Sequence, residues 1–240
     1  MVRLALLLAL LAGPAAGACR LALVMGFDVS ASVDAREYRL MMEGTGAALL
    51  SPRVQAAALA DLPVAMAAFV WAGRREQAVV ARWRMIRSEE DLRALAAQIA
   101  GFPRPTGDPM GRWSGRTAVG AALIAARGLL DQAPDCDAQT IDLAGDGINN
   151  DGPEPGPLRA ALLAGVTVNA LAVSGDLPLD HGTRADEGGQ LSAWFTEHVL
   201  WGPGAFVLSA DAYDDFERAI AEKLERELQP PLMGRLGPLR

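Results

Sequence analysis

The sequence of 240 residues contains one lysine, two cysteines and two histidines. Lys223 is the only lysine, so a phosphate-binding loop or a Schiff base, each of which uses a lysine, has a single candidate. That residue lies in a charged stretch near the C-terminus, and we therefore set lysine chemistry aside. His181 and His198 are too few and too scattered for a zinc site, which is built from clustered histidine and cysteine ligands.

The sequence also has no cluster of basic residues and no long apolar run after the N-terminus. The net charge is −7 and the pI about 4.9, which disfavours nucleic acid as a partner, because phosphate binding requires clustered Lys and Arg. No apolar run after the N-terminus reaches the roughly 18 residues of a membrane-spanning helix. Hydrophobic residues make up 51% and charged residues 21%, a composition typical of a folded α/β domain and not of a disordered chain.

Residues 1–18 have the features of a secretory signal peptide. Arg3 supplies a positive charge, residues 4–12 form a short apolar run, and residues 16–18 match the small-x-small pattern that precedes a cleavage site. We expect cleavage to leave a mature chain that begins at Cys19 and is periplasmic or secreted. A retained membrane anchor is the alternative.

The rest of the chain alternates between apolar runs typical of strands and amphipathic segments typical of helices. We expect strands at residues 21–27, 62–71, 78–86, 139–143, 166–173 and 205–209, and helices at 34–50, 88–100, 117–130, 157–164, 190–199 and 213–228. This alternation predicts an α/β fold with a doubly wound, mainly parallel sheet, helices on both faces, and one antiparallel edge strand in a hairpin. We expect one domain over residues 19–229 and a disordered tail over 230–240.

Ligands of such sheets bind beyond the carboxyl ends of the strands, and three segments there carry side-chain oxygens. Asp28, Ser30 and Ser32 follow the first strand in the pattern Asp-x-Ser-x-Ser. Thr117 ends a loop rich in glycine and proline, and Asp146 follows the fourth strand between two glycines. Such oxygens suit Mg²⁺, with Mn²⁺ or Ca²⁺ as alternatives, so we predict a divalent-cation site. Taken singly, each of these residues could instead cap a helix or a turn.

Together these residues resemble the metal-ion-dependent adhesion site (MIDAS) of von Willebrand factor A domains, and the likeness covers residues 21–228. Residues 28–34, 145–152 and 202–206, with a mature start at Cys19, are also similar to one uncharacterised family of exported bacterial A-domain proteins. The resemblance implies which side chains touch the metal directly, Ser30, Ser32 and Thr117, and which act mostly through bound water, Asp28 and Asp146.

One position departs from the family pattern. Arg116 stands before Thr117, where the family often has glycine. A cation beside the metal could weaken metal binding, or it could steer an acidic partner toward the site.

The resemblance implies a non-enzymatic binding module whose metal completes its coordination with a carboxylate of a partner protein. The alternative is a magnesium-dependent phosphatase or hydrolase that uses Asp28 as its nucleophile. Enzymes of that class typically have a second acid two residues later, where this chain has Ser30, and they use a lysine in the site. We therefore expect a binding protein with no enzymatic activity and no transmembrane span.

Two further segments have two interpretations each. Residues 147–152 are rich in Asn, Asp and Gly and could bind a second cation, but they lack the glutamate spacing of an EF-hand, which favours a polar turn. Trp113 lies in the long loop before Thr117 and either contacts a partner or pins the loop to the domain.

Cys19 and Cys136 are the only cysteines, and export exposes them to an oxidising compartment. Cys19 lies nine residues before Asp28 and Cys136 ten before Asp146, so both fall near the opposite ends of those two strands. In A-type domains these strands are neighbours, and adjacent strands are close enough for a disulfide. We predict a Cys19–Cys136 disulfide, with lipid attachment at Cys19 or two free thiols as alternatives.

Overall fold

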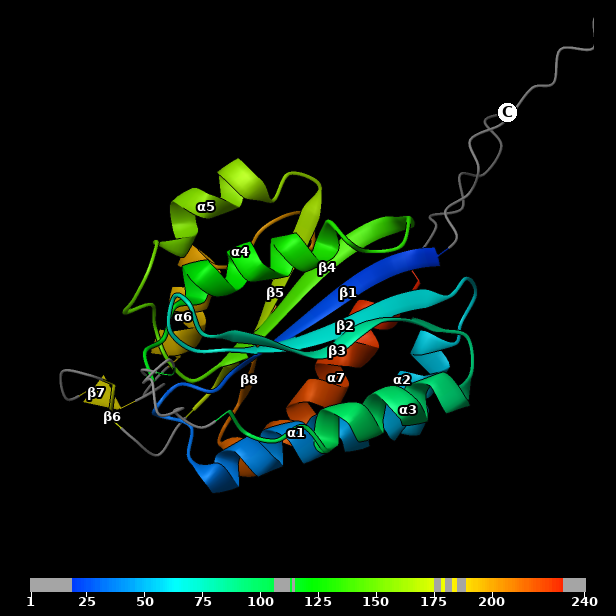
Figure 1. Cartoon of the computed structure of the whole chain (residues 1–240), viewed down its shortest axis with the longest axis horizontal. Helices are drawn as coiled ribbons and strands as arrows, with labels where there is room; N and C mark the ends of the chain where they lie inside the picture. The colour runs from blue at the N-terminus through cyan, green and yellow to red at the C-terminus, as the bar shows by residue number, and fades with distance from the viewer. Residues whose placement is uncertain are drawn as a thin grey trace, which may run out of the picture.

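A six-stranded sheet forms the centre of the molecule (Figure 1). The computed structural model describes residues 19–105, 113, 115–174, 178–179, 183–184 and 189–230. The strands are β1 (Cys19–Asp28), β2 (Val64–Trp71), β3 (Gln77–Ile86), β4 (Cys136–Gly145), β5 (Val166–Val173) and β8 (Val207–Ala210), in the order β3-β2-β1-β4-β5-β8. All pairs are parallel except β2–β3, which confirms the predicted fold and its antiparallel edge. A separate short pair consists of β6 (Pro178–Leu179) and β7 (Thr183–Arg184).

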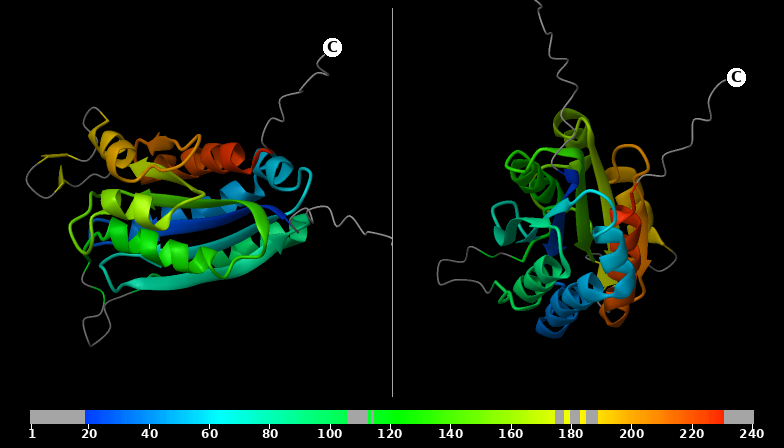
Figure 2. Two further views of the ribbon diagram at one scale, coloured as in Figure 1. Left: turned by 90° about the horizontal axis from the view of Figure 1, so that it is seen from above. Right: turned by 90° about the vertical axis from the view of Figure 1, so that its right-hand side faces the viewer.

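Helices cover both faces of the sheet (Figures 1 and 2). One face carries α1 (Ala35–Leu50), α2 (Pro52–Ala58), α3 (Glu89–Ala100), the short 3-10 helix η1 (Tyr213–Asp215) and α7 (Phe216–Leu228). The other face carries α4 (Val119–Leu130), α5 (Pro155–Leu162) and α6 (Gln190–His198). Helix α2 was not predicted, because its seven residues show no clear apolar period. The proline at its first position is well suited to a helix start.

Strand β1 is apolar along its whole length because both of its faces are buried. Leu23 and Met25 pack into the core beneath α1, α3 and α7, whereas Ala22 and Val24 pack into the core beneath α4. At Gly26 a Cβ atom would lie only 2.7 Å from the side chains of Leu143 and Phe69 on the neighbouring strands, so any larger residue would force them to move. The two cores therefore hold β1 rigidly and fix the position of its carboxyl end.

The first helix begins where the sequence predicted. The carboxylate of Asp34 accepts hydrogen bonds from the backbone N–H groups of Arg36 and Glu37, and Glu37 accepts one in return from the N–H of Asp34 at 2.7 Å. This reciprocal cap satisfies backbone donors that a helix start leaves without partners. It also ends the loop that follows β1 at a fixed residue. Ser88 caps α3, as predicted.

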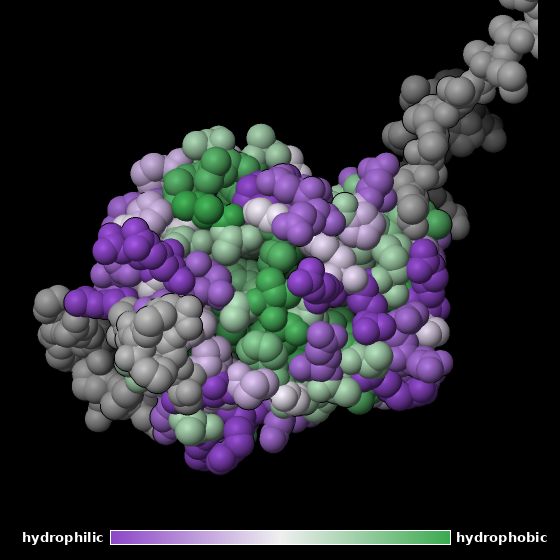
Figure 3. Space-filling model, viewed as in Figure 1, coloured by the Kyte–Doolittle hydropathy of each residue, from purple (hydrophilic) through white to green (hydrophobic). Residues whose placement is uncertain are grey.

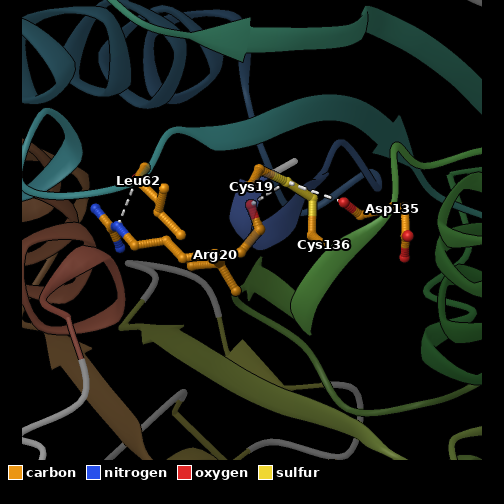
Figure 4. Close-up of a disulfide and its surroundings, with 6 residues drawn as sticks. Cys19, Arg20, Leu62, Asp135 and Cys136 are labelled. Carbon is orange, nitrogen blue, oxygen red and sulfur yellow. Dashed lines mark hydrogen bonds between the residues drawn. A yellow bond between two sulfur atoms is a disulfide. The ribbon is translucent and has the colours of Figure 1, made fainter. Parts of the chain in front are cut away.

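The predicted disulfide is present at the amino ends of β1 and β4 (Figure 4). Cys19 and Cys136 pair directly in the register of these parallel strands, with their Cα atoms 4.6 Å apart. Next to it, the guanidinium of Arg20 donates hydrogen bonds to the carbonyls of Ala57, at 2.6 Å, and Leu62, at 2.9 Å. A cation at the C-terminal end of α2 is favourable because helix carbonyls carry partial negative charge there.

On the α4 face, the outer part of the hairpin is not covered by any of the described helices. A shallow groove of about 260 Å³ lies there between β3 and α4, lined by Phe69, Val79, Ala125 and Leu129 among others. Figure 3 shows apolar (green) surface gathered near the middle of the view. The sheet is thus closed to solvent at its centre and open at one edge.

No helix within the described parts of the chain is long and apolar enough to cross a membrane. The predicted signal peptide, residues 1–18, lies outside the described residues, and so does the predicted tail from residue 231 onward. Both remain predictions.

Candidate functional site

The site lies where β1 and β4 end side by side. Asp28 is the last residue of β1, and Asp146 directly follows Gly145, the last residue of β4. A Cβ atom at Gly145 would lie 3.2 Å from Oδ2 of Asp28, which explains why this position has no side chain. Asp28 is fully buried and Asp146 is 4% exposed, so the fold holds two carboxylates together away from bulk water.

The loop after β1 joins the two acids through its hydroxyl groups. The backbone N–H of Ser30 donates to Oδ1 of Asp28 at 2.8 Å, which folds the loop back over the strand end. The hydroxyls of Ser30 and Ser32 lie 3.0 Å apart, and that of Ser32 donates to Oδ1 of Asp146 at 2.7 Å. The Asp-x-Ser-x-Ser loop thus links its two hydroxyls to each other and to Asp146.

Thr117 lies beside Asp146 and comes from the loop that precedes α4. It lies before α4 and is not part of it, whereas the sequence predicted a helix from this residue. A Cβ atom at Gly147 would lie 3.3 Å from the Thr117 hydroxyl, so the chain after Asp146 passes directly over it. The structure therefore brings together all five predicted residues: Asp28, Ser30, Ser32, Thr117 and Asp146.

Asn150 holds Thr117 in this position, and sequence patterns did not reveal it. The backbone N–H of Thr117 donates to Oδ1 of Asn150 at 2.9 Å, and the N–H of Asn150 donates to the Thr117 carbonyl at 2.8 Å. Asn149 accepts a bond from the N–H of Gly120 in the first turn of α4 at 3.3 Å. The polar segment after Asp146 is thus a turn that fixes the Thr117 loop.

Hydrogen bonds within the protein also occupy the side-chain oxygens of residues 147–152, the segment that could bind a second cation. The carboxylate of Asp151 accepts a hydrogen bond from the backbone N–H of Arg74 at 2.9 Å. With Asn149 and Asn150 engaged as well, these side-chain oxygens already bind protein groups. The polar-turn interpretation fits this geometry.

Burial and the repulsion between neighbouring negative charges disfavour the charged form of both carboxylates. Burial, followed by the negative charge of Asp146, raises the pKa of Asp28 well above its ordinary value. Burial, followed by the charge of Glu37, raises the pKa of Asp146 to about 6. Oδ2 of Asp28 is buried and has no hydrogen-bond partner among the described residues. A divalent cation would relieve this repulsion and give that oxygen a partner.

Tyr213 is a second residue that the sequence did not single out. It lies in η1 and is 3% exposed. Burial and the nearby charges of Asp146, Asp28 and Glu37 raise the pKa of its hydroxyl well above the ordinary value, so this hydroxyl stays neutral beside the acids. The packing of η1 against α1 and α7 brings it there.

The two histidines and Trp113, the other residues considered from the sequence, are not part of this site. His198 ends α6, where its ring packs on Trp194 with centroids 5.1 Å apart, and His181 lies outside the described residues. Trp113 is partly buried against the core, which supports the pinning interpretation. Within the described ranges, no cluster of three or more His, Cys, Asp and Glu side chains is placed to hold a metal. The site at the ends of β1 and β4 is of another kind, because it has two carboxylates and its other oxygens are hydroxyls.

The sheet order, the helix layers and this site define an A-type domain, and solved structures confirm the fold. A pilus adhesin, SpaC from Lactobacillus rhamnosus GG, is similar with a TM-score of 0.61 and 14% identity over 88% of this chain and 30% of that chain. Proximal thread matrix protein 1 from the mussel byssus has a TM-score of 0.58 and 16% identity over 88% of this chain and 48% of that chain. A von Willebrand factor type A protein from Catenulispora acidiphila has a TM-score of 0.52 and 16% identity over 88% of this chain and 42% of that chain. This chain thus has a von Willebrand factor A-like fold, and it spans less than half the length of these proteins.

The chain belongs to the family described as protein of unknown function (DUF1194), whose profile matches residues 18–232. No curated protein matches it. One structure of the mussel protein is described as having a zinc-occupied MIDAS motif. That description applies to the mussel protein, and at 16% identity the likeness to this chain is one of fold.

Proposed function

We propose that this protein is an exported, non-enzymatic binding module that holds one divalent cation and presents it to a carboxylate of a partner protein. The ligands would be Asp28, Ser30, Ser32, Thr117 and Asp146. The observation that carries the proposal is the buried pair of carboxylates, with three hydroxyls arranged around the pair. One oxygen of Asp28 has no hydrogen-bond partner in the part of the chain that the structure describes.

The donor set fits a hard divalent cation. It consists of two carboxylates and three hydroxyls, all oxygen, which suits Mg²⁺ or Mn²⁺, with Ca²⁺ as a further alternative. The two negative charges balance the cation, and five protein groups leave room for an external oxygen. When bound, the cation supplies a Lewis-acidic point that attracts an anionic ligand. The zinc-occupied MIDAS motif of the mussel protein supports the assignment of a divalent cation and adds Zn²⁺ to the metals to be compared.

Export is part of the proposal. Residues 1–18 have the pattern of a signal peptide, and the Cys19–Cys136 disulfide is of the kind that forms in oxidising compartments. Similarity in fold to a pilus adhesin and a byssus protein supports the same conclusion.

Calorimetry with Mg²⁺, Mn²⁺, Ca²⁺ and Zn²⁺ on the mature protein tests the metal site. We expect one site per chain, which Asp28→Ala abolishes because it removes the carboxylate with the unpartnered oxygen. Asp211→Ala is the matched control, since this aspartate lies at the same sheet edge but is exposed. Equal binding by the wild type and Asp28→Ala would contradict the proposal.

The enzymatic alternative depends on a lysine in the site, and the structure places Lys223 elsewhere. Its ammonium is fully buried and pairs with Asp142, in the middle of β4, and with Glu227 of α7. An aspartyl-phosphate mechanism at Asp28 therefore has no lysine to draw on, and this favours binding over catalysis.

We accordingly expect no turnover on ester, phosphoester or peptide substrates in the presence of Mg²⁺. A panel of chromogenic substrates measures this directly. Metal-dependent turnover that disappears in Asp28→Asn would overturn the binding proposal in favour of a hydrolase.

A further inference from the structure

Strand β3 forms an edge of the sheet, and its outer side is open. It pairs with β2, and within the described parts of the chain no strand lies on its other side. Figure 1 shows β3 in front of the other strands, between α4 and α3, and Figure 3 shows apolar surface near the middle of the same view. An edge strand presents backbone N–H and C=O groups with which another strand can pair. An open edge of ten residues is therefore a candidate binding surface.

A hollow of about 340 Å³ follows this open side. It is lined by Val79, Val80, Arg82, Trp83 and Arg84 of β3 and by Gln98 of α3. Val80 packs into the core beneath α1, α3 and α7, whereas Trp83 packs into the core beneath α4. Successive side chains of a strand point to opposite faces of the sheet. Because the hollow touches side chains of both faces, it runs along the edge itself.

One point of the edge is already covered. Val80 has no partner on β2, and the register between the strands shifts beside it. The side chain of Gln98 donates a hydrogen bond to the Val80 carbonyl at 3.1 Å. Among the described residues, no other side chain bonds to the backbone of β3. The segment from Arg82 to Ile86, which follows this point, is therefore the open part of the edge.

The two faces beside the open edge differ in chemistry. On the α4 face, Val79 is 47% exposed and lines the apolar groove between β3 and α4. On the other face, Arg84 lies opposite Met66 of β2, whose side chain is in the core beneath α3. The hollow along the edge is lined by two arginines, of which Arg82 is exposed, and by no acidic residue. An added strand would thus meet apolar surface on one side and positive charge on the other.

We propose that β3 binds an extended acidic segment of a partner protein, which adds to the sheet as a further strand. Apolar side chains of the segment would lie in the groove beside Val79, and the acidic side chains that alternate with them would lie over Arg82 and Arg84. In complexes of this kind, backbone hydrogen bonds provide affinity and the alternate side chains provide specificity. Arginine suits the acidic side chains because its guanidinium donates paired hydrogen bonds to a carboxylate. This surface is separate from the metal site and goes beyond the proposed function.

The same arginines disfavour a second copy of this chain as the occupant. Antiparallel pairing of two open segments about Trp83 sets Arg82 of each copy opposite Arg84 of the other, and pairing about Arg84 sets this residue opposite itself. Like charges directly opposite each other in a sheet are destabilising. An acidic segment instead gives each arginine a partner of opposite charge.

Peptide binding to the wild-type protein tests strand addition directly. The probe is a synthetic peptide of about eight residues, within the usual length of a strand, in which valine and aspartate alternate. It is titrated into the ¹⁵N-labelled mature protein and followed by NMR. We expect chemical-shift changes along β3 and slower amide exchange there. A control peptide with the same side chains and N-methylated backbone amides cannot donate to the edge, and its Kd should be at least about tenfold higher.

Substitutions on the two faces test the side-chain contacts. Arg84→Glu should weaken binding of the peptide roughly tenfold, because one attraction is lost and one repulsion is added. It should prefer a peptide in which lysine replaces aspartate. Val79→Asp should also weaken binding, since a charge at the groove excludes apolar side chains. The matched controls are Arg39→Glu, an exposed arginine of α1, and Ile124→Asp, which is 45% exposed on α4 and lines neither hollow. Neither control should change the Kd.

Four results would overturn the proposal. They are an absence of shifts along β3, equal binding of the N-methylated peptide, a loss in Arg39→Glu as large as in Arg84→Glu, and a concentration-dependent dimer in sedimentation that Val79→Asp abolishes. The last result would assign the edge to a second copy. The comparison of the two peptides uses the wild type and so does not depend on how a variant folds. Metal binding at Asp28 is measured separately and stands or fails independently of this surface.

Discussion

Thr117 shows how a proposed metal ligand depends on a neighbour that does not touch the metal. Its backbone is held on both sides by Asn150, and Gly147 leaves just enough room for its hydroxyl. Groups that orient ligands in this way commonly affect metal affinity strongly, because the ligand must otherwise be fixed at an entropic cost. Asn150 is therefore a positioning residue of the proposed site.

We expect Asn150→Ala to weaken Mg²⁺ binding about tenfold, since the Thr117 N–H loses its acceptor and the loop loses its register. Asn150→Asp keeps an acceptor at the same place and should restore most of the affinity. Asn149→Ala is the control, because it removes a cap from α4 but no bond to Thr117. Calorimetric Kd values and thermal unfolding of the metal-free proteins separate lost affinity from lost stability. An Asn150→Ala protein with wild-type Kd would contradict the positioning role.

Helix α7 carries a buried ionic cluster against the sheet. Lys223, which the sequence places in a charged stretch near the C-terminus, is 0% exposed and pairs with Asp142 and Glu227. Asn169 of β5 donates to Glu227 at 2.8 Å. Two acids share one lysine, and burial together with the charge of Asp142 raises the pKa of Glu227 to about 7 from its ordinary value of 4.5. The folded protein thus binds a proton here that the unfolded chain would release.

This cluster predicts a pH dependence of stability. Because the pKa of Glu227 is higher in the folded state, its contribution is complete below the unfolded pKa of about 4.5 and is lost as the pH rises through about 7. Glu227→Gln should flatten the decline in the free energy of unfolding across this range, by an amount on the order of 2 kcal/mol. Glu222→Gln, exposed on the same helix, is the control. Urea unfolding at a series of pH values measures the effect, and parallel curves for the wild type and Glu227→Gln would show the assignment to be wrong.

Strands β1 and β4 are joined by a disulfide at one end and carry the two site aspartates at the other. At their amino ends lies the Cys19–Cys136 disulfide, and at their carboxyl ends lie Asp28 and Asp146. The disulfide closes a loop with a sequence separation of 117 residues, and this constrains the unfolded chain more than a short loop would. The same strand pair therefore positions the proposed metal site and joins the two halves of the fold.

We expect the double substitution Cys19→Ser and Cys136→Ser to lower the free energy of unfolding by up to about 4–5 kcal/mol. Metal affinity should stay unchanged, because the disulfide lies at the far end of the strands from the site. Denaturant unfolding and calorimetry test the two halves of this expectation. The intact mass of the exported wild type should be about 2 Da below that of the dithiol form, as oxidation removes two hydrogens. A lipid-sized mass increase, or two titratable thiols in the native protein, would contradict the disulfide.

Local chemistry was enough to predict much of this protein. The alternation of apolar runs and amphipathic segments predicted the order of strands and helices, and Asp34 and Ser88 marked two helix starts. The pattern from Asp28 to Ser32 was readable because its residues act within one loop. These features depend on residues close together in the chain, where spacing alone fixes which groups meet.

Other contacts between distant segments were decided only by the tertiary structure. Lys223 has the local pattern of a surface residue, and only the packing of α7 against β4 buries it beside Asp142. The roles of Asn150 and Tyr213 likewise depend on which loops meet at the sheet edge. A sequence states which groups are present, but burial and the pairing of distant charges follow from the packing of whole elements, because the solvent that a group loses is removed by residues far away in the chain.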